Sequence, residues 1–198
     1  MSKRSVERTG YNIKSAQHQW LRHFVKKPTR RAPLIHLGYF IRIKAVERVV
    51  DEVRSLGLNA DVQFLSEPTS QRKIVVNLGC GYDPLPFVYL STTSNVVFVD
   101  VDYPDLIRHK SAVVRETPAL REVLGSEFGE TSGEIRTQSY YAVGCDLSNL
   151  SLFDKLLRDI EPDIDNAMIL FISEVAITYM VILLSSELIN SLHQRQIH

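Results

Sequence analysis

Beyond residue 73 the chain alternates short apolar runs with amphipathic segments. The apolar runs predict strands at Ile74–Leu78, Val96–Asp100, Ser139–Val143 and Ala167–Ile172. Between them, helices are predicted at Tyr103–Val114, where Pro104 suits the first turn, and at Leu150–Ile160. Strands that alternate with helices in this way are typical of a parallel sheet covered by helices on its faces. The pattern therefore predicts an α/β fold.

The first third of the chain is organised differently. Residues 1–33 read as a basic, partly helical arm that Pro28 and Pro33 interrupt. Apolar residues then recur at helical spacing from Ile41 to Leu56, and Gly57 suits the end of that helix. Exposed loops are predicted at Ser66–Gln71 and Phe128–Gln138. We expect an N-terminal arm over 1–40, a main domain over 41–180 and a divergent tail over 181–198.

Composition gives the protein class and one marked asymmetry. The 198 residues are 44% hydrophobic and 23% charged, as in an ordinary globular domain. The net charge is zero, but residues 1–54 hold 13 Lys and Arg against 4 Asp and Glu. The basic residues are densest at Lys26, Lys27, Arg30 and Arg31. This cluster suits a nucleic acid or another anionic partner, although a solvated arm has the same composition.

Two features bear on the cellular compartment. Cys80 and Cys145 have no metal-type spacing and are too few for a disulfide framework, which favours a reducing environment. The N-terminus has no apolar signal region, so we expect a cytoplasmic protein. The cysteine spacing gives no reason to expect a bound metal. The apolar run over 167–184 raises the question of a membrane span, but Glu174 within it would cost about 2.5–3.5 kcal/mol in a bilayer. A buried strand, a polar turn and an apolar helix explain the run better, and no membrane contact is expected.

Ligands of parallel sheets bind at the carboxyl ends of the strands, and here each predicted strand ends in unusual residues. The four endings are Asn77-Leu78-Gly79-Cys80-Gly81, Asp100-Val101-Asp102, Gly144-Cys145-Asp146-Leu147 and Ser173-Glu174. Gly79 and Gly81 allow a sharp turn and a close approach by a ligand. A dinucleotide-binding loop would need a third glycine, which is absent, so NAD is disfavoured. Asp83 and Pro84 then suit the start of a helix.

The acidic residues extend this interpretation to a nucleoside. A carboxylate can accept hydrogen bonds from both ribose hydroxyls, and Asp100 and Asp102 lie on the same side of an extended chain. One of them could hold a ribose while the other caps the next helix. Asp146 could accept from an adenine amine, with Leu147 against the ring, although Asp146 could equally begin the helix over 150–160. In this order the residues describe an adenosine pocket, and the short glycine turn without a phosphate-binding lysine favours S-adenosylmethionine.

Four motifs carry a resemblance to a known family. The stretches VNLGCGYDPLPF, FVDVDYPDLIRHK, YAVGCDL and LFISEVAITYM occur in this order and resemble the leucine carboxyl methyltransferase family. The motif SKRSVE near the start and the sequence GCGYDPLPF most resemble the corresponding motifs of the branch that acts in wybutosine modification of tRNA. The resemblance extends over about residues 2–180. The branch that methylates a protein phosphatase carries a different sequence after its Gly-x-Gly.

The resemblance implies a class I methyltransferase fold with a Rossmann-like sheet, S-adenosylmethionine as methyl donor and a carboxylate as acceptor. In the wybutosine branch this carboxylate belongs to a modified guanosine of phenylalanine tRNA. The alternative acceptor is the C-terminal leucine of a protein phosphatase catalytic subunit. No general base is expected, because a carboxylate is already nucleophilic at neutral pH. The family pattern would place these residues at the cofactor: Lys3, Gly79, Gly81, Asp102, Asp146, Leu147 and Glu174, with Tyr179 nearer the acceptor.

Two departures from the family pattern affect these expectations. The family has Arg-Gly-Tyr where this chain has Leu37-Gly38-Tyr39, so an arginine that would pair with the cofactor carboxylate is missing, and Arg42 or Lys3 would have to replace it. The residues after Met180 do not match the strands that continue the family's sheet. We therefore expect an incomplete sheet in a truncated product. The alternative function is a non-catalytic remnant that keeps the cofactor pocket or a basic binding face.

Overall fold

The computed structural model describes residues 16–25, 32–55, 72–90, 96–125, 133–180 and 182–196. The chain divides into two compact units. The first comprises residues 1–68 together with 82–89, and the second comprises 69–81 together with 90–198. Each unit is described by itself.

The first unit is helical. It holds α1 (Ala16–Phe24), α2 (Pro33–Ser55) and most of α3 (Leu85–Leu90). The fully buried ring of Phe87 lies 5.6 Å from the ring of Phe24 and 6.3 Å from that of Trp20, measured between ring centroids. Aromatic pairs at such distances stabilise a core beyond the area they bury. An aromatic cluster thus joins α1 to α3 within this unit.

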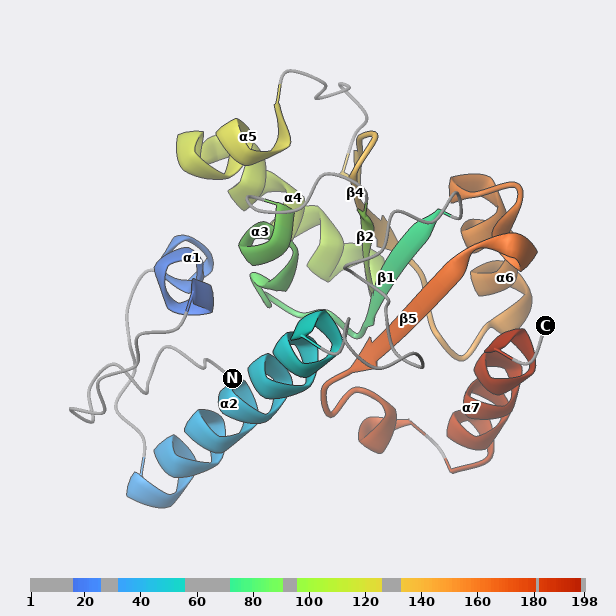
Figure 1. Ribbon diagram of the computed structural model, residues 1–198, viewed down its shortest axis with the longest axis horizontal. Helices are drawn as coiled ribbons and strands as arrows, with labels where there is room; N and C mark the ends of the chain where they lie inside the picture. The colour runs from blue at the N-terminus through green and yellow to red at the C-terminus, as the bar shows by residue number, and fades with distance from the viewer. Residues whose placement is uncertain are drawn as a thin grey trace. The chain divides into compact units, whose positions relative to one another are not determined.

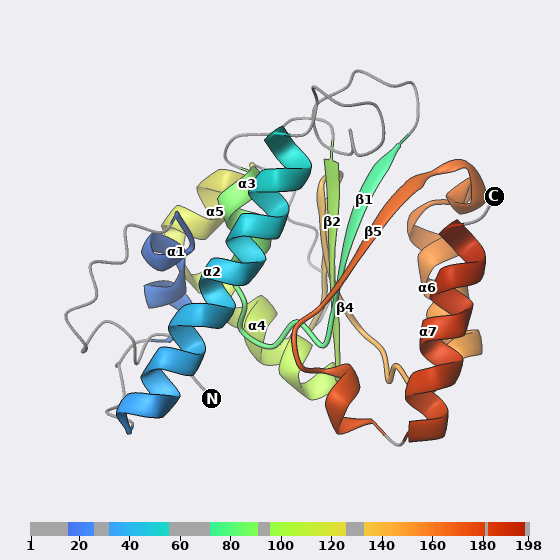
Figure 2. The same cartoon turned by 60° about the horizontal axis from the view of Figure 1, so that its bottom comes forward.

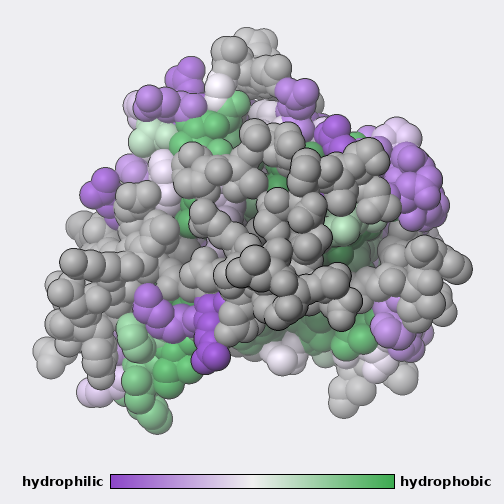
Figure 3. Space-filling model, in the orientation of Figure 1, coloured by the Kyte–Doolittle hydropathy of each residue, from purple (hydrophilic) through white to green (hydrophobic). Residues whose placement is uncertain are grey.

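Helix α2 begins earlier than the sequence predicts and buries a different face. Pro33 stands at its first position instead of interrupting the chain, because the fixed φ angle of proline suits a helix start. The expected boundary after residue 40 therefore falls inside this helix, and the division into three parts stays a prediction. His36, Tyr39 and Ile43 are buried, whereas Leu34 and Ile41 are exposed. Figure 3 shows apolar side chains on the surface where α2 begins.

The second unit is built on a five-stranded sheet with the order β3-β4-β2-β1-β5 (Figure 1). All neighbouring strands run parallel except β3 and β4. The strands are β1 (Lys73–Leu78), β2 (Val96–Asp102), β3 (Ile135–Arg136), β4 (Tyr140–Gly144) and β5 (Met168–Ser173). The four parallel strands confirm the predicted α/β sheet.

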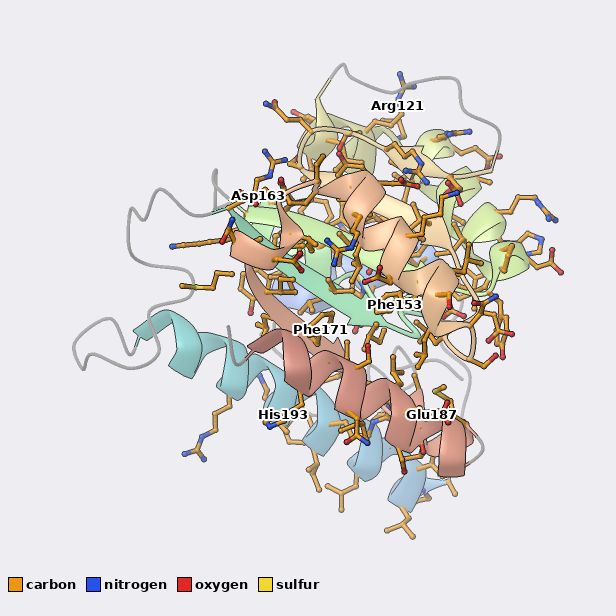
Figure 4. The ribbon with its side chains drawn as sticks, turned by 90° about the vertical axis from the view of Figure 1, so that its right-hand side faces the viewer. Arg121, Phe153, Asp163, Phe171, Glu187 and His193 are labelled. Atoms are coloured by element: carbon orange, nitrogen blue, oxygen red, sulfur yellow. The ribbon has the colours of Figure 1, made fainter. Side chains whose placement is uncertain are left out.

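Helices cover both faces of this sheet (Figure 2). Helix α4 (Pro104–Glu116) lies on one face, and α5 (Pro118–Leu124) follows it in the chain. Helices α6 (Leu150–Ile160) and α7 (Ile182–Gln196) cover the other face. Between them and the sheet lies an apolar core that includes Phe153 of α6, with Phe171 of β5 packed against it (Figure 4).

Most predicted elements are confirmed, and the exceptions have physical causes. Helix α6 has the predicted bounds, and the predicted strands recur within two residues. The predicted loop over 128–138 contains β3, whose Ile135 is buried against the sheet. Helix α5 was not predicted. Both missed elements are short and depend on neighbours distant in the sequence, which local apolar patterns do not reveal.

The apolar run over 167–184 is divided as the sequence suggests. It forms β5, the 3₁₀ helix η3 (Ile177–Tyr179) and the beginning of α7. In the part of the chain that the structure describes, no helix is long and apolar enough to cross a membrane.

Strand β5 is the outer strand of the sheet among the described residues, since it pairs with β1 alone. Its residues are less buried than those of β1 and β2. The tail over 181–198 contributes to the core, because Leu188 of α7 is fully buried among the side chains of the sheet and α6. Helix α7 is therefore part of the second unit.

Substitution of Leu188 tests this contribution. Leu188→Ala should lower the free energy of unfolding by about 2–5 kcal/mol, because it leaves a cavity under α7. Ile189→Ala on the same helix is the matched control, since Ile189 is 49% exposed, and it should change stability by less than about 0.5 kcal/mol. Urea unfolding followed by circular dichroism measures both. Equal effects of the two substitutions would show that α7 does not pack as described.

Candidate functional site

The strand register brings the polar strand endings to one edge of the sheet. Leu78 at the end of β1 pairs with Val101 of β2 and with Ser173 of β5. Asp102 at the end of β2 pairs with Gly144 at the end of β4. The glycine loop, the acids that follow β2 and β4, and Glu174 after β5 therefore start from the same edge. This edge is where ligands of parallel sheets bind.

The glycine loop turns in a conformation that favours glycine. Gly79 and Gly81 have φ angles of 65° and 52°. The backbone N–H groups of Gly79 and Cys80 both donate to the carbonyl oxygen of Val101, at 2.8 and 3.1 Å. The N–H of Gly81 donates to Oδ2 of Asp102 at 2.8 Å. The loop after β1 is thus attached to the end of β2 by backbone and carboxylate together.

Asp102 is placed to bind a ligand as well as the loop. Its Oδ1 accepts from the N–H of Tyr103 at 2.7 Å, so each carboxylate oxygen has one backbone donor. The side chain is partly exposed, and the ring of Tyr103 beside it is 62% exposed. A carboxylate can accept about four hydrogen bonds, so two further donors, such as a pair of hydroxyls, can be accommodated.

Asp100 does not share this role. Strand β2 continues to Asp102, so Asp100 lies inside the strand with a fully buried side chain. Its carboxylate accepts from Lys110 Nζ at 2.8 Å, from the Tyr140 hydroxyl at 2.7 Å and from Asn77 Nδ2 at 3.2 Å. Of the two acids that could hold a ribose, only Asp102 remains a candidate. Burial, together with the nearby Asp100 carboxylate, raises the pKa of Tyr140 well above its ordinary value.

Asp146 and Leu147 follow β4 and have different surroundings. Oδ1 of Asp146 accepts from the N–H of Ser148 at 2.9 Å, and this bond, together with a hydrogen bond from the Ser148 side chain, lowers the pKa of the carboxyl. The helix cap of α6 is Asn149, which accepts from the N–H of Leu152. Asp146 is therefore not the capping residue of α6, and its carboxylate binds Ser148 instead. Leu147 is buried in the core under α6, which disfavours the expected contact with an adenine ring.

The two cysteines at the strand ends are both buried. Burial, with a smaller effect of the nearby Asp146 carboxylate, raises the pKa of Cys145 to about 11. The thiol is therefore protonated at neutral pH and a poor nucleophile. Within the described residues no group of His, Cys, Asp or Glu side chains is arranged to hold a metal ion.

The turn after β5 is strained and closely packed. Val175 has a φ of 70°, which is unfavourable for a β-branched residue. Its carbonyl oxygen accepts from the N–H and hydroxyl of Thr178, which closes the turn. Ala176 then lies so near the glycine loop that a Cβ on Gly79 would stand 2.2 Å from its methyl carbon. Glu174 is partly buried beside this turn.

Other expected site residues belong to the first unit or lie outside the described residues. Asp83 accepts from the N–H of Leu85 at 3.2 Å at the start of α3, which supports its capping role. Leu37 is 38% exposed on α2, and the guanidinium carbon of Arg42 lies 5.8 Å from the centre of the Tyr39 ring. Tyr179 lies in η3, but its side chain is not described. Lys3 and the basic cluster at 26–31 are also outside the described residues.

Sequence reasoning missed the partners of Asp100 and the strained Val175. One signal of the buried charge was present, because Lys110 occupies a position on the apolar face of α4 together with Ile107 and Val114. A lysine at such a position needs an acidic partner when the helix packs on a sheet. The strain at Val175 has no counterpart in the sequence pattern.

The two loop glycines give a matched test of the packing against Ala176. Gly81→Ala should cost about 1–2 kcal/mol in the free energy of unfolding, because its φ is positive but nothing lies within 4 Å of the new methyl group. Gly79→Ala should cost about 1–3 kcal/mol more, because it also clashes with Ala176. Adding Ala176→Gly to Gly79→Ala should recover most of that difference. Equal costs in urea unfolding would contradict the close contact.

Comparison with known proteins gives a consistent result. The family model described as leucine carboxyl methyltransferase matches residues 3–192, beyond residue 180 where the motifs suggested that the resemblance ends. A tRNA wybutosine-synthesizing protein 4 from Emericella nidulans is 44% identical over 188 residues, which cover 91% of this chain and 16% of that protein. Proteins of the same name from Eremothecium gossypii and Schizosaccharomyces pombe are 39% and 38% identical and are each covered to 26%.

The chain therefore spans about a sixth to a quarter of the length of these relatives. The parallel sheet, with helices on both faces and polar residues at the carboxyl edge, agrees with the Rossmann-like methyltransferase fold that the motifs predicted. The match over nearly the whole chain and the identity above 30% lead to one conclusion: the chain belongs to the leucine carboxyl methyltransferase family.

Proposed function

We propose that this chain forms the cofactor-binding part of an S-adenosylmethionine-dependent carboxyl O-methyltransferase of the wybutosine tRNA-modification type. Family membership and the names of the relatives support this proposal. The observation that carries it is Asp102, a partly exposed carboxylate at the end of β2 that is fixed by two backbone donors and can accept two more.

The residues at the sheet edge fit the adenosine half of the cofactor. Asp102 would accept the two ribose hydroxyls, and the space beside Gly81, where a Cβ would meet nothing within 4 Å, leaves room for the ligand. Asp146, whose carboxylate also accepts from Ser148, would accept from the adenine amine. Glu174 would lie toward the amino acid end of the cofactor. The buried Leu147 is not expected to contact the base directly.

Methyl transfer to a carboxylate requires correct orientation of donor and acceptor and no proton transfer. S-adenosylmethionine, when bound, would supply a methyl group that is already activated by its sulfonium. A carboxylate acceptor with an ordinary pKa near 4 is ionised at neutral pH, so this chain needs no general base. The residues at the strand ends would hold the donor in one orientation and exclude water.

The proposed acceptor is a carboxylate on phenylalanine tRNA, and a cytoplasmic location accompanies this proposal. The relatives are named for wybutosine synthesis, and the first 54 residues carry an excess of nine positive charges, 13 against 4. A protein phosphatase as acceptor has no support among these relatives. Because the chain spans only part of their length, the complete activity is proposed for the protein to which this domain corresponds.

Titration with S-adenosylhomocysteine tests the cofactor site. Asp102→Asn should weaken binding by about 1.5–3 kcal/mol, or about 10–150-fold, because it removes charged acceptors for the ribose. Asp105→Asn is the matched control, since Asp105 lies three residues away and is exposed in a surface pair with Arg108. It should bind as the wild type does. Binding by the wild type together with unchanged binding by Asp102→Asn would refute the ribose assignment, and no binding by the wild type would refute the cofactor.

Salt dependence tests the nucleic acid partner. Binding of phenylalanine tRNA should weaken steeply as salt rises, because phosphate contacts release counterions. Replacing Lys26, Lys27, Arg30 and Arg31 by Glu should abolish most of the affinity measured by filter binding. Reversing the exposed Arg121 and Lys155 of α5 and α6 is the control and should have a small effect. An affinity that is independent of salt, or equal losses in both variants, would exclude the basic cluster as the tRNA surface.

A further inference from the structure

The buried carboxylate of Asp100 joins three elements of the second unit. Lys110 comes from α4, Tyr140 from β4 and Asn77 from β1, and each donates to one of the two carboxylate oxygens. The side chains of Asp100 and Lys110 have no exposed surface. We call Asp100, Lys110, Tyr140 and Asn77 the Asp100 network.

The Asp100 network balances its charge internally. The ammonium group of Lys110 and the carboxylate of Asp100 are 2.8 Å apart, and the raised pKa of Tyr140 keeps its phenol protonated at neutral pH. A buried ion pair of this kind is not a general source of stability, because apolar residues of similar volume often serve equally well. What such a pair can supply is a single geometry for the elements that it joins.

The Asp100 network lies next to the proposed ribose site. Asp102 follows Asp100 by two residues on the same strand, so both side chains leave the sheet on the face that carries α4. The carbonyl oxygen of Asp102 accepts from the N–H of Cys145 at 2.9 Å. Helix α4 begins at Pro104, whose Cα is only 2.8 Å from the place where a Cβ on Gly144 would stand.

The start of α4 is thereby held between two attachments. Gly144 allows Pro104 to approach the end of β4, and Lys110, six residues along the helix, ties α4 to the interior of β2. Tyr103 lies between Asp102 and this helix, and its N–H is one of the two backbone donors to the Asp102 carboxylate. A shift of α4 along the sheet would move Tyr103 and with it the orientation of Asp102.

We propose that Lys110 and Asp100 are positioning residues for cofactor binding, which set the orientation of the Asp102 carboxylate through the start of α4. This inference rests on the proposed function, in which Asp102 binds ribose. Neither residue touches the ligand. Removing Lys110 and Asp100 is therefore expected to weaken the recognition of the ribose hydroxyls. It is also expected to weaken the hydrogen bonds from the two N–H groups that bind Asp102.

The test uses a neutral double variant. Asp100→Asn combined with Lys110→Met removes both charges at similar volume, so no unpaired charge is left in the interior. The control is Asp165→Asn combined with Arg158→Met, which removes an exposed ion pair between an arginine and an aspartate and also frees the exposed Asp154 from Arg158. Both variants comprise all 198 residues. Circular dichroism and urea unfolding establish that each variant is folded.

Two measurements distinguish a role in positioning Asp102 from a role in the stability of the fold alone. In the Asp100 and Lys110 double variant, amide exchange at Gly81 and Tyr103 should accelerate about tenfold or more, the effect of losing one net hydrogen bond, while amides of α6 keep their rates. The preference for S-adenosylhomocysteine over its 2′-deoxyribose analogue should fall toward unity. The control variant should match the wild type in both. A folded double variant with wild-type exchange and an unchanged preference would overturn the proposal.

A milder variant keeps the test decisive if the double variant does not fold. Tyr140→Phe removes one hydrogen bond to Asp100 with little change in volume. It should accelerate exchange at Gly81 and Tyr103 more than in α6. Uniform acceleration, which reports only lower stability, would overturn the proposal. If the wild type fails to bind S-adenosylhomocysteine, the proposed function is wrong, but the exchange rates still decide whether the Asp100 network positions Asp102.

Discussion

The arrangement of the sheet edge depends on one buried carboxylate. An ionised side chain without solvent must be surrounded by donors, and Asp100 obtains them from α4, β4 and β1 at once. Helix α4 covers that face of the sheet and brings the ammonium group of Lys110 to 2.8 Å from the carboxylate. Pro104 at the start of the same helix lies against Gly144, next to the turn that presents Asp102.

The two faces of the sheet are built on different interactions. On the face covered by α6 and α7, the strands present Val, Ile and Leu side chains, and the packing is apolar. Apolar contacts are not directional, so they tolerate small shifts of a helix at little cost. On the face covered by α4, the Asp100 network adds hydrogen bonds with defined lengths and angles. The more directional face is the one from which the Asp102 side chain leaves the sheet.

Sequence patterns predicted the elements whose signal is local. The apolar run of β1 could be identified because all six of its residues are buried, and the bounds of α6 could be identified because it buries one face at helical spacing. The two-residue β3 could not, because Ile135 is held by pairing with Ala142 across the sheet. Pro33 was interpreted as an interruption because proline permits both a break and a helix start.

For the site, the sequence placed polar residues at strand ends that the register brings to one edge of the sheet, but it did not distinguish the two acids of β2. Asp100 and Asp102 have the same residue type and point to the same side of β2, so spacing alone cannot distinguish them. The distinction depends on how far β2 continues and on Lys110, a residue of the following helix. Leu147 similarly follows an acid at a strand end but turns into the core, because the chain must enter α6 there.

The packing around Gly79 indicates where along the edge a ligand can lie. At the junction of β1 and β5, the absence of a side chain on Gly79 is used by Ala176, and the strained φ of Val175 brings Ala176 there. Strain of this kind persists only where surrounding contacts impose it. At the junction of β1 and β2, Gly81 has the same type of conformation, but a Cβ added there would meet nothing within 4 Å. A side chain on Gly79 therefore has no room between β1 and β5, whereas the position of Gly81 is open next to Asp102, on the face of the sheet that holds the Asp100 network.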